Sequence, residues 1–236
     1  MNIDLIAGMM GDTDEGWQFA IKRTLELQPD SVTIYQMEIP YNTTIYKDMH
    51  AQGNEIAPVA GWQKKRDWVT YAFAQLEANG YTITSAYTAV KNPDKTKFVY
   101  RDQLWTGADL IGMGVASFSH IGGTHFQNQH NLEPYLEKLN AGELPIYRAL
   151  TPKPGEQLIR ELLLQSKLGT ISKAYFANKF GVDILTHFAP AFETLFATGH
   201  LHDEGEILRF DRQGLLQVDR LIHEFFLPEH RDARYA

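Results

Sequence analysis

The first eleven residues, MNIDLIAGMMG (1–11), predict a buried strand followed by a turn. The run over 3–7 is apolar except at Asp4, and the glycines at 8 and 11 supply the turn. A buried carboxylate without a partner costs several kcal/mol, so Asp4 requires a hydrogen-bond donor. This strand therefore raises the question of what its charge binds.

The next segments extend the strand into a βαβ unit. Residues 12–27 predict a helix, with Asp12 or Thr13 as its N-cap and an apolar face at i, i+4, i+8 from Trp17. SVTIYQMEIP (31–40) predicts a second strand of β-branched and aromatic residues. Short connections in this order indicate parallel strands with a right-handed crossover.

The chain then continues the alternation of helix and strand. Residues 41–60 form a long polar connection, a length that indicates a functional or mobile loop. A helix is expected over 62–80 and a third strand over 81–90. The pattern matches the later half of an α/β barrel or of a doubly wound sheet.

The amino-acid composition changes in the next stretch, LWTGADLIGMGVASFSHIGGTHFQNQH (104–130), which contains five glycines and three histidines. Small residues permit close approach of the backbone to a ligand or to another strand, and both interpretations remain open. His120, His125 and His130 are spaced by five, which aligns them on no single face of a helix or strand. The spacing therefore predicts no metal site.

From about residue 151 the composition shifts, and the sequence pattern predicts mainly helices. Three helices are expected over 156–169, 172–181 and 184–199, then a hairpin turning at Glu204–Gly205 and a last helix over 211–228. Helices followed by a hairpin resemble a winged-helix module, but the acids in its hairpin and last helix favour a packing or lid role over DNA binding. We expect two domains, 1–150 and 151–236.

The amino-acid composition excludes several classes of function. Hydrophobic residues make up 44% of the 236, charged residues 22%, and the net charge is −7, which argues against a nucleic-acid surface. No apolar run could span a bilayer and no leader is evident, so we expect a cytoplasmic protein. The absence of cysteine excludes thiolate nucleophiles, disulfides and cysteine-bound clusters within these residues.

Several stretches together resemble one family, the oxygen-independent coproporphyrinogen III oxidase-like radical SAM proteins. The stretches that carry this resemblance, in order and spacing, are NIDLIAGMMGDTDEGW (2–17), VTIYQMEIP (32–40) and LWTGADLIGMGVASFSHIGG (104–123). Four others are most similar to its anaerobic haem-degrading branch, the anaerobilin synthase-like methyltransferases: YNTTIYKDM (41–49), SAYTAVK (85–91), KFVYRDQLWTGAD (97–109) and FFLPEHR (225–231).

The resemblance implies an α/β fold class: the C-terminal portion of a partial (β/α)6 radical SAM barrel, followed by a mostly helical, winged-helix-like domain. Residues 2–8 would be about its fifth strand. The family's earlier strands carry a three-cysteine motif and a glycine-rich segment that have no counterpart here. We therefore expect part of a longer enzyme, whether a truncation, a split-gene half or a cut piece, that needs an N-terminal half or a partner chain.

The resemblance also implies S-adenosylmethionine and a 4Fe–4S cluster as cofactors, with the cluster ligands absent from this chain. Asp4 would accept hydrogen bonds from ribose hydroxyls, or else pair with a local donor. Ile6 and Met37 would line the adenine pocket, partly through backbone groups, and Phe118 would pack on the adenine face. We expect Ile6 and Phe118 to be buried, and Asp4, Met37 and Phe118 to converge on one cleft at the strand ends.

The implied substrate is a tetrapyrrole, either haem or coproporphyrinogen. The favoured reaction is anaerobic haem degradation by methyl transfer and ring opening; the alternatives are coproporphyrinogen oxidation and haem binding by a chaperone. His120 is the weak catalytic candidate, as an iron ligand or proton donor, against a reading of all three histidines as hydrogen-bonding loop residues. Tyr41, Tyr46 and Lys47 would meet the porphyrin face and propionates. Alone, the chain is expected to be inactive.

The opening strand also carries an expectation about association. A barrel strand has a neighbour on each side, and a bare edge beside apolar side chains is a template for pairing. We therefore expect the isolated chain to self-associate or aggregate.

Overall fold

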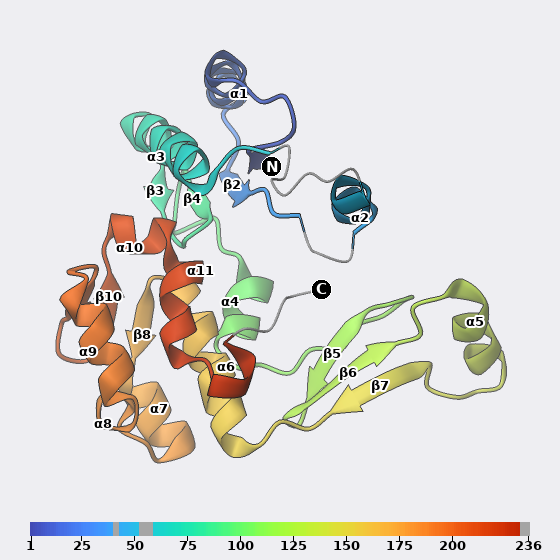
Figure 1. The fold of residues 1–236 in the computed structure, drawn as a ribbon. Helices are drawn as coiled ribbons and strands as arrows, with labels where there is room; N and C mark the ends of the chain where they lie inside the picture. The colour runs from blue at the N-terminus through green and yellow to red at the C-terminus, as the bar shows by residue number, and fades with distance from the viewer. Residues whose placement is uncertain (40–42, 52–58, 232–236) are drawn as a thin grey trace.

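The computed structural model describes residues 1–39, 43–51 and 59–231 as a mixed α/β fold. Figure 1 shows three parts: an N-terminal sheet covered by helices, a projecting arm, and a helical C-terminal region. We call residues 118–150 the arm and residues 154–230 the C-terminal region. The arm extends away from the other two parts.

The N-terminal sheet has the strand order β1-β2-β4-β3. β1 (Asn2–Ala7) and β2 (Ser31–Gln36) are parallel, and α1 (Asp14–Leu27) connects them. The predicted βαβ unit is therefore confirmed. Thr13, one of the two expected N-caps, accepts a hydrogen bond from the backbone N–H of Gly16.

The expected third strand is a hairpin. β3 (Thr82–Ile83) and β4 (Thr88–Val90) pair with each other antiparallel, and β4 pairs antiparallel with β2. The chain reverses between them, where the Thr84 N–H donates to the Thr88 carbonyl at 2.9 Å. A continuous strand over 81–90 was thus wrong. The helix expected before it is confirmed as α3 (Trp62–Ala78), and the connection expected as a loop contains α2 (Thr44–Ala51).

One face of the N-terminal sheet packs against α1 and α3. Its core includes Val32 and Ile34 from β2 together with Trp17, Trp68 and Phe73 from the helices. Trp17 donates its indole N–H to the Trp68 carbonyl at 2.8 Å, and the two rings stack at 6.1 Å. Because side chains alternate along a strand, the intervening residues of β1 and β2 point to the opposite face.

The arm follows α4 (Val99–Trp105) and an irregular segment rich in glycine. It contains β5 (Phe118–Ile121), β6 (Thr124–Asn128), α5 (Leu132–Asn140) and β7 (Ile146–Leu150), with its strands antiparallel in the order β5-β6-β7. Gly122 and Gly123 form the β5–β6 turn with φ of 55° and 77°, a conformation that favours glycine.

The C-terminal region contains the expected helices and hairpin. Its elements are α6 (Pro154–Lys167), β8 (Thr170–Ser172), α7 (Lys173–Phe180), α8 (Ile184–His187), α9 (Ala189–Ala197), β9 (Leu201–Asp203) and β10 (Ile207–Phe210). β10 pairs antiparallel with both β8 and β9. The third expected helix is divided into α8 and α9 at Phe188, which leaves the helical conformation.

The expected last helix was wrong as one element. It consists of α10 (Arg212–Leu216), α11 (Val218–Leu221) and 3-10 turns at Ile222–Phe225 and Pro228–His230. Gln217, with φ of −126° and ψ of 18°, interrupts the helix between α10 and α11.

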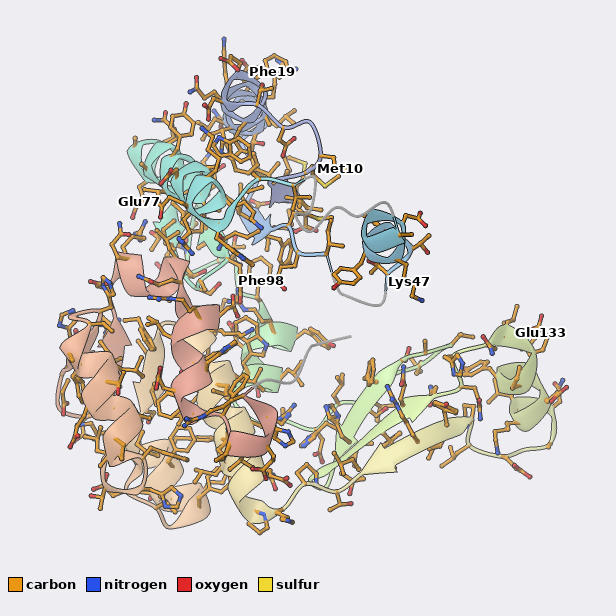
Figure 2. The ribbon with its side chains drawn as sticks, viewed as in Figure 1. Met10, Phe19, Lys47, Glu77, Phe98 and Glu133 are labelled. Carbon is orange, nitrogen blue, oxygen red and sulfur yellow. The ribbon has the colours of Figure 1, made fainter. Side chains whose placement is uncertain are left out.

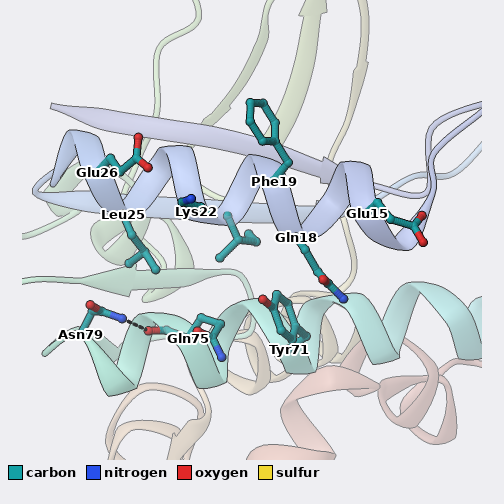
Figure 3. A pocket seen from close by; sticks show the side chains of 10 residues that line it. Glu15, Gln18, Phe19, Lys22, Leu25, Glu26, Tyr71, Gln75 and Asn79 are labelled. Carbon is teal, nitrogen blue, oxygen red and sulfur yellow. Dashed lines mark hydrogen bonds between the residues drawn. The ribbon is translucent and has the colours of Figure 1, made fainter.

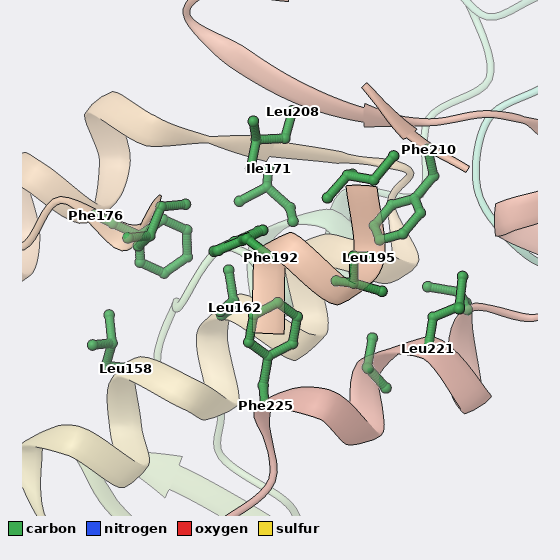
Figure 4. Close-up of a cluster of buried hydrophobic side chains, with 14 of the residues drawn as sticks. Leu158, Leu162, Ile171, Phe176, Phe192, Leu195, Leu208, Phe210, Leu221 and Phe225 are labelled. Atoms are coloured by element: carbon green, nitrogen blue, oxygen red, sulfur yellow. The ribbon is translucent and has the colours of Figure 1, made fainter. Parts of the chain in front are cut away.

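The C-terminal region has its own hydrophobic core, in which Phe176, Leu162, Leu195 and Leu208 are fully buried (Figure 4). Ala86, next to β4, belongs to the same cluster and joins the region to the N-terminal sheet. Within the described ranges, no helix is both long and apolar enough to cross a membrane.

Candidate functional site

Asp4 lies on the face of the N-terminal sheet that α1 and α3 leave free. We call this the Asp4 face; its residues are Asn2, Asp4, Ile6, Ser31, Thr33 and Tyr35. The Asp4 side chain is exposed, and its Oδ1 accepts a hydrogen bond from the Asn2 amide at 2.8 Å. The Asn2 carbonyl oxygen in turn accepts from the Ser31 hydroxyl at 2.7 Å. Asp4 thus has the local donor that its sequence required, and its Oδ2 accepts nothing from the described residues.

An apolar surface lies beside this carboxylate. Ile6 and Tyr35 are register partners on β1 and β2, and they are 44% and 48% exposed. The Tyr35 ring stacks on Tyr87 with centroids 6.0 Å apart. The expected burial of Ile6 was wrong, because the described chain packs its apolar side chains on the other face of the sheet. The result is a carboxylate next to an accessible aliphatic and aromatic surface.

The carboxyl ends of β1 and β2 are held by a buried lysine. Lys65, on α3, donates from Nζ to the Met37 carbonyl at 2.7 Å, and burial lowers its pKa. The Met37 N–H donates to the Ala7 carbonyl at 2.8 Å. Gly8 has a φ of 97°, and a Cβ there would lie 2.6 Å from Lys65 Cδ. These contacts fix both strand ends in place.

Two consequences follow for sequence-predicted roles. Met37 is half-buried at this edge; its N–H donates to Ala7 and its carbonyl accepts from Lys65, which leaves the second lone pair of that carbonyl and the side chain for a ligand. Sequence reasoning missed Lys65, because it stands in the charged run QKKRD, which predicts exposure. The only local sign of this contact was Gly8. A glycine is needed there because Lys65, which is distant in the sequence, packs against it.

The loop after β1 is ordered by Asp12. Its carboxylate accepts from the N–H groups of Gly8 at 3.1 Å and Met9 at 2.8 Å. Met9 and Met10 are 45% and 60% exposed, and Figure 2 shows Met10 on this loop. Flexible thioether side chains thus border the Asp4 face at the strand ends.

Tyr87 ties this sheet to the C-terminal region. Its hydroxyl donates to Asp219 Oδ2 at 2.7 Å, and Lys167 forms an ion pair with the same carboxylate at 2.8 Å. Burial and the Asp219 charge raise the pKa of Tyr87. The side chain is therefore a neutral hydrogen-bond donor at physiological pH.

Phe118 is not brought to this site. It lies on β5, which Figure 1 shows well apart from β1 and β2. Its side chain is 53% exposed and its ring centroid lies 6.3 Å from that of His125. The expected burial of Phe118 was wrong, because no other described element packs over its side chain on the arm. The structure brings Asp4, Ile6 and Met37 to one sheet and leaves Phe118 on another.

His120 is buried, with 2% exposure, and both of its ring nitrogens lack a hydrogen-bond partner among the described residues. Burial and the nearby Arg160 guanidinium lower the pKa of its imidazole. His125 Nδ1 lies 2.9 Å from the Ser119 carbonyl, and His130 is exposed with its ring 4.7 Å from Tyr147. The interpretation of these histidines as hydrogen-bonding loop residues is therefore wrong for His120, which lies on β5 without a side-chain hydrogen bond to the described chain, and only partly right for His125, which forms one but lies on β6; His130 lies in a loop.

The other sequence-predicted contacts lie near α2. Tyr41 is outside the described residues. Tyr46 is half-buried on α2 and donates its N–H to the Thr43 hydroxyl at 3.3 Å, while Lys47 is exposed on the same helix (Figure 2). Over residues 1–39, 43–51 and 59–231, no group of three or more His, Cys, Asp or Glu side chains is placed to hold a metal ion.

A pocket of about 660 Å³ lies between α1 and α3, on the side of the sheet opposite to the Asp4 face (Figure 3). Phe19, Leu25 and Tyr71 supply its apolar surface, and Glu15 and Glu26 its charge. It contains none of the predicted site residues. Its lining is that of an ordinary groove between two helices.

Comparisons with known proteins identify the relatives of this chain. Oxygen-independent coproporphyrinogen III oxidase of Pseudomonas aeruginosa is 24% identical over an alignment of length 254, which covers 100% of this chain and 54% of that protein. Heme chaperone HemW of Bacillus subtilis is 22% identical over 95% of this chain and 58% of its own length. The chain is a low-identity homologue of these proteins.

A solved structure agrees with these relatives. Coproporphyrinogen III oxidase (HemN) from Escherichia coli, described as a radical SAM enzyme, matches with a TM-score of 0.74 and 20% identity over 95% of this chain and 54% of that one. The likeness shows a shared fold. No family model matches the chain. The chain spans 37% to 58% of the length of the first curated relatives it matches. These relatives do not support the haem-degrading branch that four stretches of the sequence indicated.

Proposed function

We propose that this chain forms one wall of the S-adenosylmethionine site and the C-terminal part of a radical SAM protein that acts on a tetrapyrrole, in the manner of an oxygen-independent coproporphyrinogen III oxidase. The observation that carries the proposal is the Asp4 face. It presents an exposed carboxylate beside Ile6 and Tyr35, in a chain whose whole length aligns with the Pseudomonas aeruginosa oxidase.

The residues of the Asp4 face fit the nucleoside part of this cofactor. Asp4 Oδ2 accepts nothing from the described protein and can accept hydrogen bonds from ribose hydroxyls. Ile6 and Tyr35 offer the exposed apolar area against which an adenine ring would pack. Lys65 holds the adjoining strand ends, so the binding surface is preorganised.

S-adenosylmethionine bound at a 4Fe–4S cluster supplies the radical chemistry in this class of enzyme. The chain contains no cysteine, so cysteine ligands for such a cluster must come from outside these 236 residues. In the proposed arrangement a further polypeptide segment carries the cluster, and this chain positions and shields the nucleoside. We expect the isolated chain to bind without cleaving the cofactor.

The same proposal covers the architecture. The parallel pair β1–β2 with α1 and α3 would be late strands of a partial barrel with its inner side at the Asp4 face. The C-terminal region follows the winged-helix order of α6, β8, α7, α9 and the β9–β10 hairpin, and would act as a packing module. The two-domain division at about residue 150 and a cytoplasmic location belong to this proposal as well.

A haem-binding role is the second candidate, and the match to the Bacillus subtilis heme chaperone favours it. The two candidates differ in the tetrapyrrole that they require. Titration of the purified chain with haemin distinguishes them: a saturable Soret shift at one equivalent, with no response to coproporphyrin III, would favour the chaperone. The reverse preference would favour the oxidase.

Calorimetric titration with S-adenosylhomocysteine, a stable analogue, tests the nucleoside site. We expect Asp4→Asn to weaken binding roughly 10- to 100-fold, since a hydrogen bond to a charged group contributes about 1.5–3 kcal/mol. Asp94→Asn is the matched control, because Asp94 is an exposed loop residue whose carboxylate forms no described bond. Equal affinity in wild type and Asp4→Asn would refute the assignment of Asp4.

A further inference from the structure

Arg160 is a half-buried cation without an ion pair in the described structure. It lies on α6, and its Nη1 atom is buried with no hydrogen-bond partner among residues 1–39, 43–51 and 59–231. The neighbouring carboxylate, Glu161, already accepts from the Tyr175 hydroxyl at 2.5 Å and from Lys179 Nζ at 2.8 Å. The Glu161 charge acts on this guanidinium but forms no ion pair with it, and a buried N–H without an acceptor is costly, so Nη1 can accommodate the oxygen of an anion.

Two histidines of the arm lie beside this guanidinium. The β5–β6 turn packs on α6, since a Cβ at Gly123 would lie 3.3 Å from Gln157 Oε1, and Arg160 follows one helical turn later. His120 precedes that turn, and its ring stands at 84° to that of His125 with centroids 5.4 Å apart. The guanidinium, with burial, lowers the pKa of both imidazoles.

Three buried atoms here lack a hydrogen-bond partner among the described residues: Arg160 Nη1 and one His120 nitrogen as donors, and the other nitrogen of a neutral His120 as an acceptor. The Ser119 carbonyl can only accept, so His125 Nδ1 carries the proton in its contact at 2.9 Å. A neutral His120 has one N–H, and that N–H has no acceptor in the described chain. Arg160 Nη1 and the His120 N–H are thus two unpaired donors, and the effect of the Arg160 charge on the His120 imidazole indicates that the two groups lie near each other.

We propose that Arg160 and His120 form a binding site for the oxygen atoms of one carboxylate or phosphate group, where the arm meets α6. The planar guanidinium pairs two oxygens at once, and the imidazole N–H supplies a third bond. The identity of the anion rests on the proposed function. If that function holds, the bound group is a carboxylate side chain of the tetrapyrrole.

Fluorescence titration with coproporphyrin III, which carries propionate groups, measures this site in the 236-residue chain. Arg160→Gln is expected to weaken binding about tenfold or more, and Arg160→Lys, which keeps the charge but loses the fork, by less. Arg66→Gln is the matched control, a helical arginine of α3 with no described ion pair, and it should bind as wild type does. Circular dichroism verifies that each variant is folded.

A second probe separates this site from the proposed function. Inorganic phosphate is titrated into histidine-¹⁵N-labelled protein, and occupancy should move the His120 and His125 ring signals in wild type but not in Arg160→Gln. Phosphate response without porphyrin binding would uphold the anion site and overturn the tetrapyrrole source. Equal porphyrin binding by wild type and Arg160→Gln, with no phosphate response, would overturn the site and leave the proposed function standing. No response to either probe would overturn the site.

Discussion

The arm and the C-terminal region are stabilised in opposite ways. In the C-terminal region, Phe176, Leu162 and Leu195 are fully buried in a shared core. In the arm, whose residues 118–150 are all described, Pro145 is the one buried apolar residue, and Leu144 and Leu150 are 76% and 66% exposed. Backbone pairing and side-chain hydrogen bonds, such as those of the Asn128 amide to Gly112 and Gly114, hold the arm.

The two regions should therefore contribute unequally to the free energy of unfolding. Burial of an aromatic side chain contributes a few kcal/mol, whereas the net contribution of one hydrogen bond is about 1 kcal/mol. The C-terminal region should therefore dominate the free energy of unfolding. The arm, which carries Phe118 and His120, is free to serve a ligand or partner at little cost to the fold.

The largest expected effect comes from the C-terminal core. Phe176→Ala removes a fully buried ring that stacks on Phe180 at 6.0 Å, and should lower the free energy of unfolding by about 3–5 kcal/mol. Leu144→Ala in the arm should change it by less than about 0.5 kcal/mol. Urea unfolding followed by circular dichroism measures both. Similar losses of unfolding free energy in the two variants would contradict the claim that the C-terminal core contributes more stability than the arm.

A smaller effect is expected where the arm's connecting segment meets the C-terminal region. Glu161 is fully buried and paired with Lys179, and the single hydroxyl proton of Tyr175 is shared between Glu161 and the carbonyl of Thr106, 2.8 Å away. Lys179→Met removes the ammonium that donates to this carboxylate and should cost about 1.5–3 kcal/mol, the contribution of a hydrogen bond to a charged group. Lys173→Met, which removes the more exposed pair with Asp203, is the control and should cost less than about 1 kcal/mol. Equal costs would mean that burial of Glu161 carries no penalty.

The smallest expected effect is a pH dependence from the arm. Burial and then Arg160 lower the pKa of His120, so below pH about 6.5 the unfolded chain binds a proton that the folded chain resists. Stability therefore falls on acidification through that range, by at most about 1.4 kcal/mol per pH unit for this group.

Replacing His120 with phenylalanine should remove this dependence. His120→Phe should melt no lower than wild type at pH 7.5, because it replaces unpaired polar atoms with an apolar ring, and should lose fewer degrees between pH 7.5 and 5.5. Differential scanning fluorimetry at both pH values provides the comparison. An unchanged pH slope would show that His120 titrates normally in the folded protein.

Association in solution tests the exposed strand. β1 pairs only with β2 among the described strands, so its other edge offers backbone groups for pairing. Light scattering after size exclusion should show species larger than a monomer at tens of micromolar. A thermally stable monomer at that concentration would show that this edge is protected.

Local patterns were sufficient to predict much of the fold. Apolar periodicity located α1 and α3, and alternation of helix and strand predicted the parallel pairing of β1 with β2. The hairpin within 81–90 and the break at Gln217 were missed because each depends on one or two backbone angles that any residue there could adopt. The arm was not foreseen, since glycine-rich sequence fits both a ligand loop and a tight crossing.

The candidate site was predicted only in part. Asp4 stood out because a charge inside an apolar run demands a partner, and the structure supplies Asn2. Lys65 and Arg160 were missed, because a basic residue on an amphipathic helix normally lies in solvent. Lys65 contacts Gly8, and the β5–β6 turn packs on the helix of Arg160 at Gln157; both are tertiary contacts that no local pattern contains.

Hydrogen exchange with mass spectrometry tests most directly whether the Asp4 face is the nucleoside site. The chain is labelled with and without saturating S-adenosylhomocysteine. We predict slower exchange in peptides covering residues 2–8 and 31–37, with α1 and the arm unchanged, and loss of this protection in Asp4→Asn. Protection confined to the helices that line the pocket between α1 and α3, with residues 2–8 unaffected, would contradict the account.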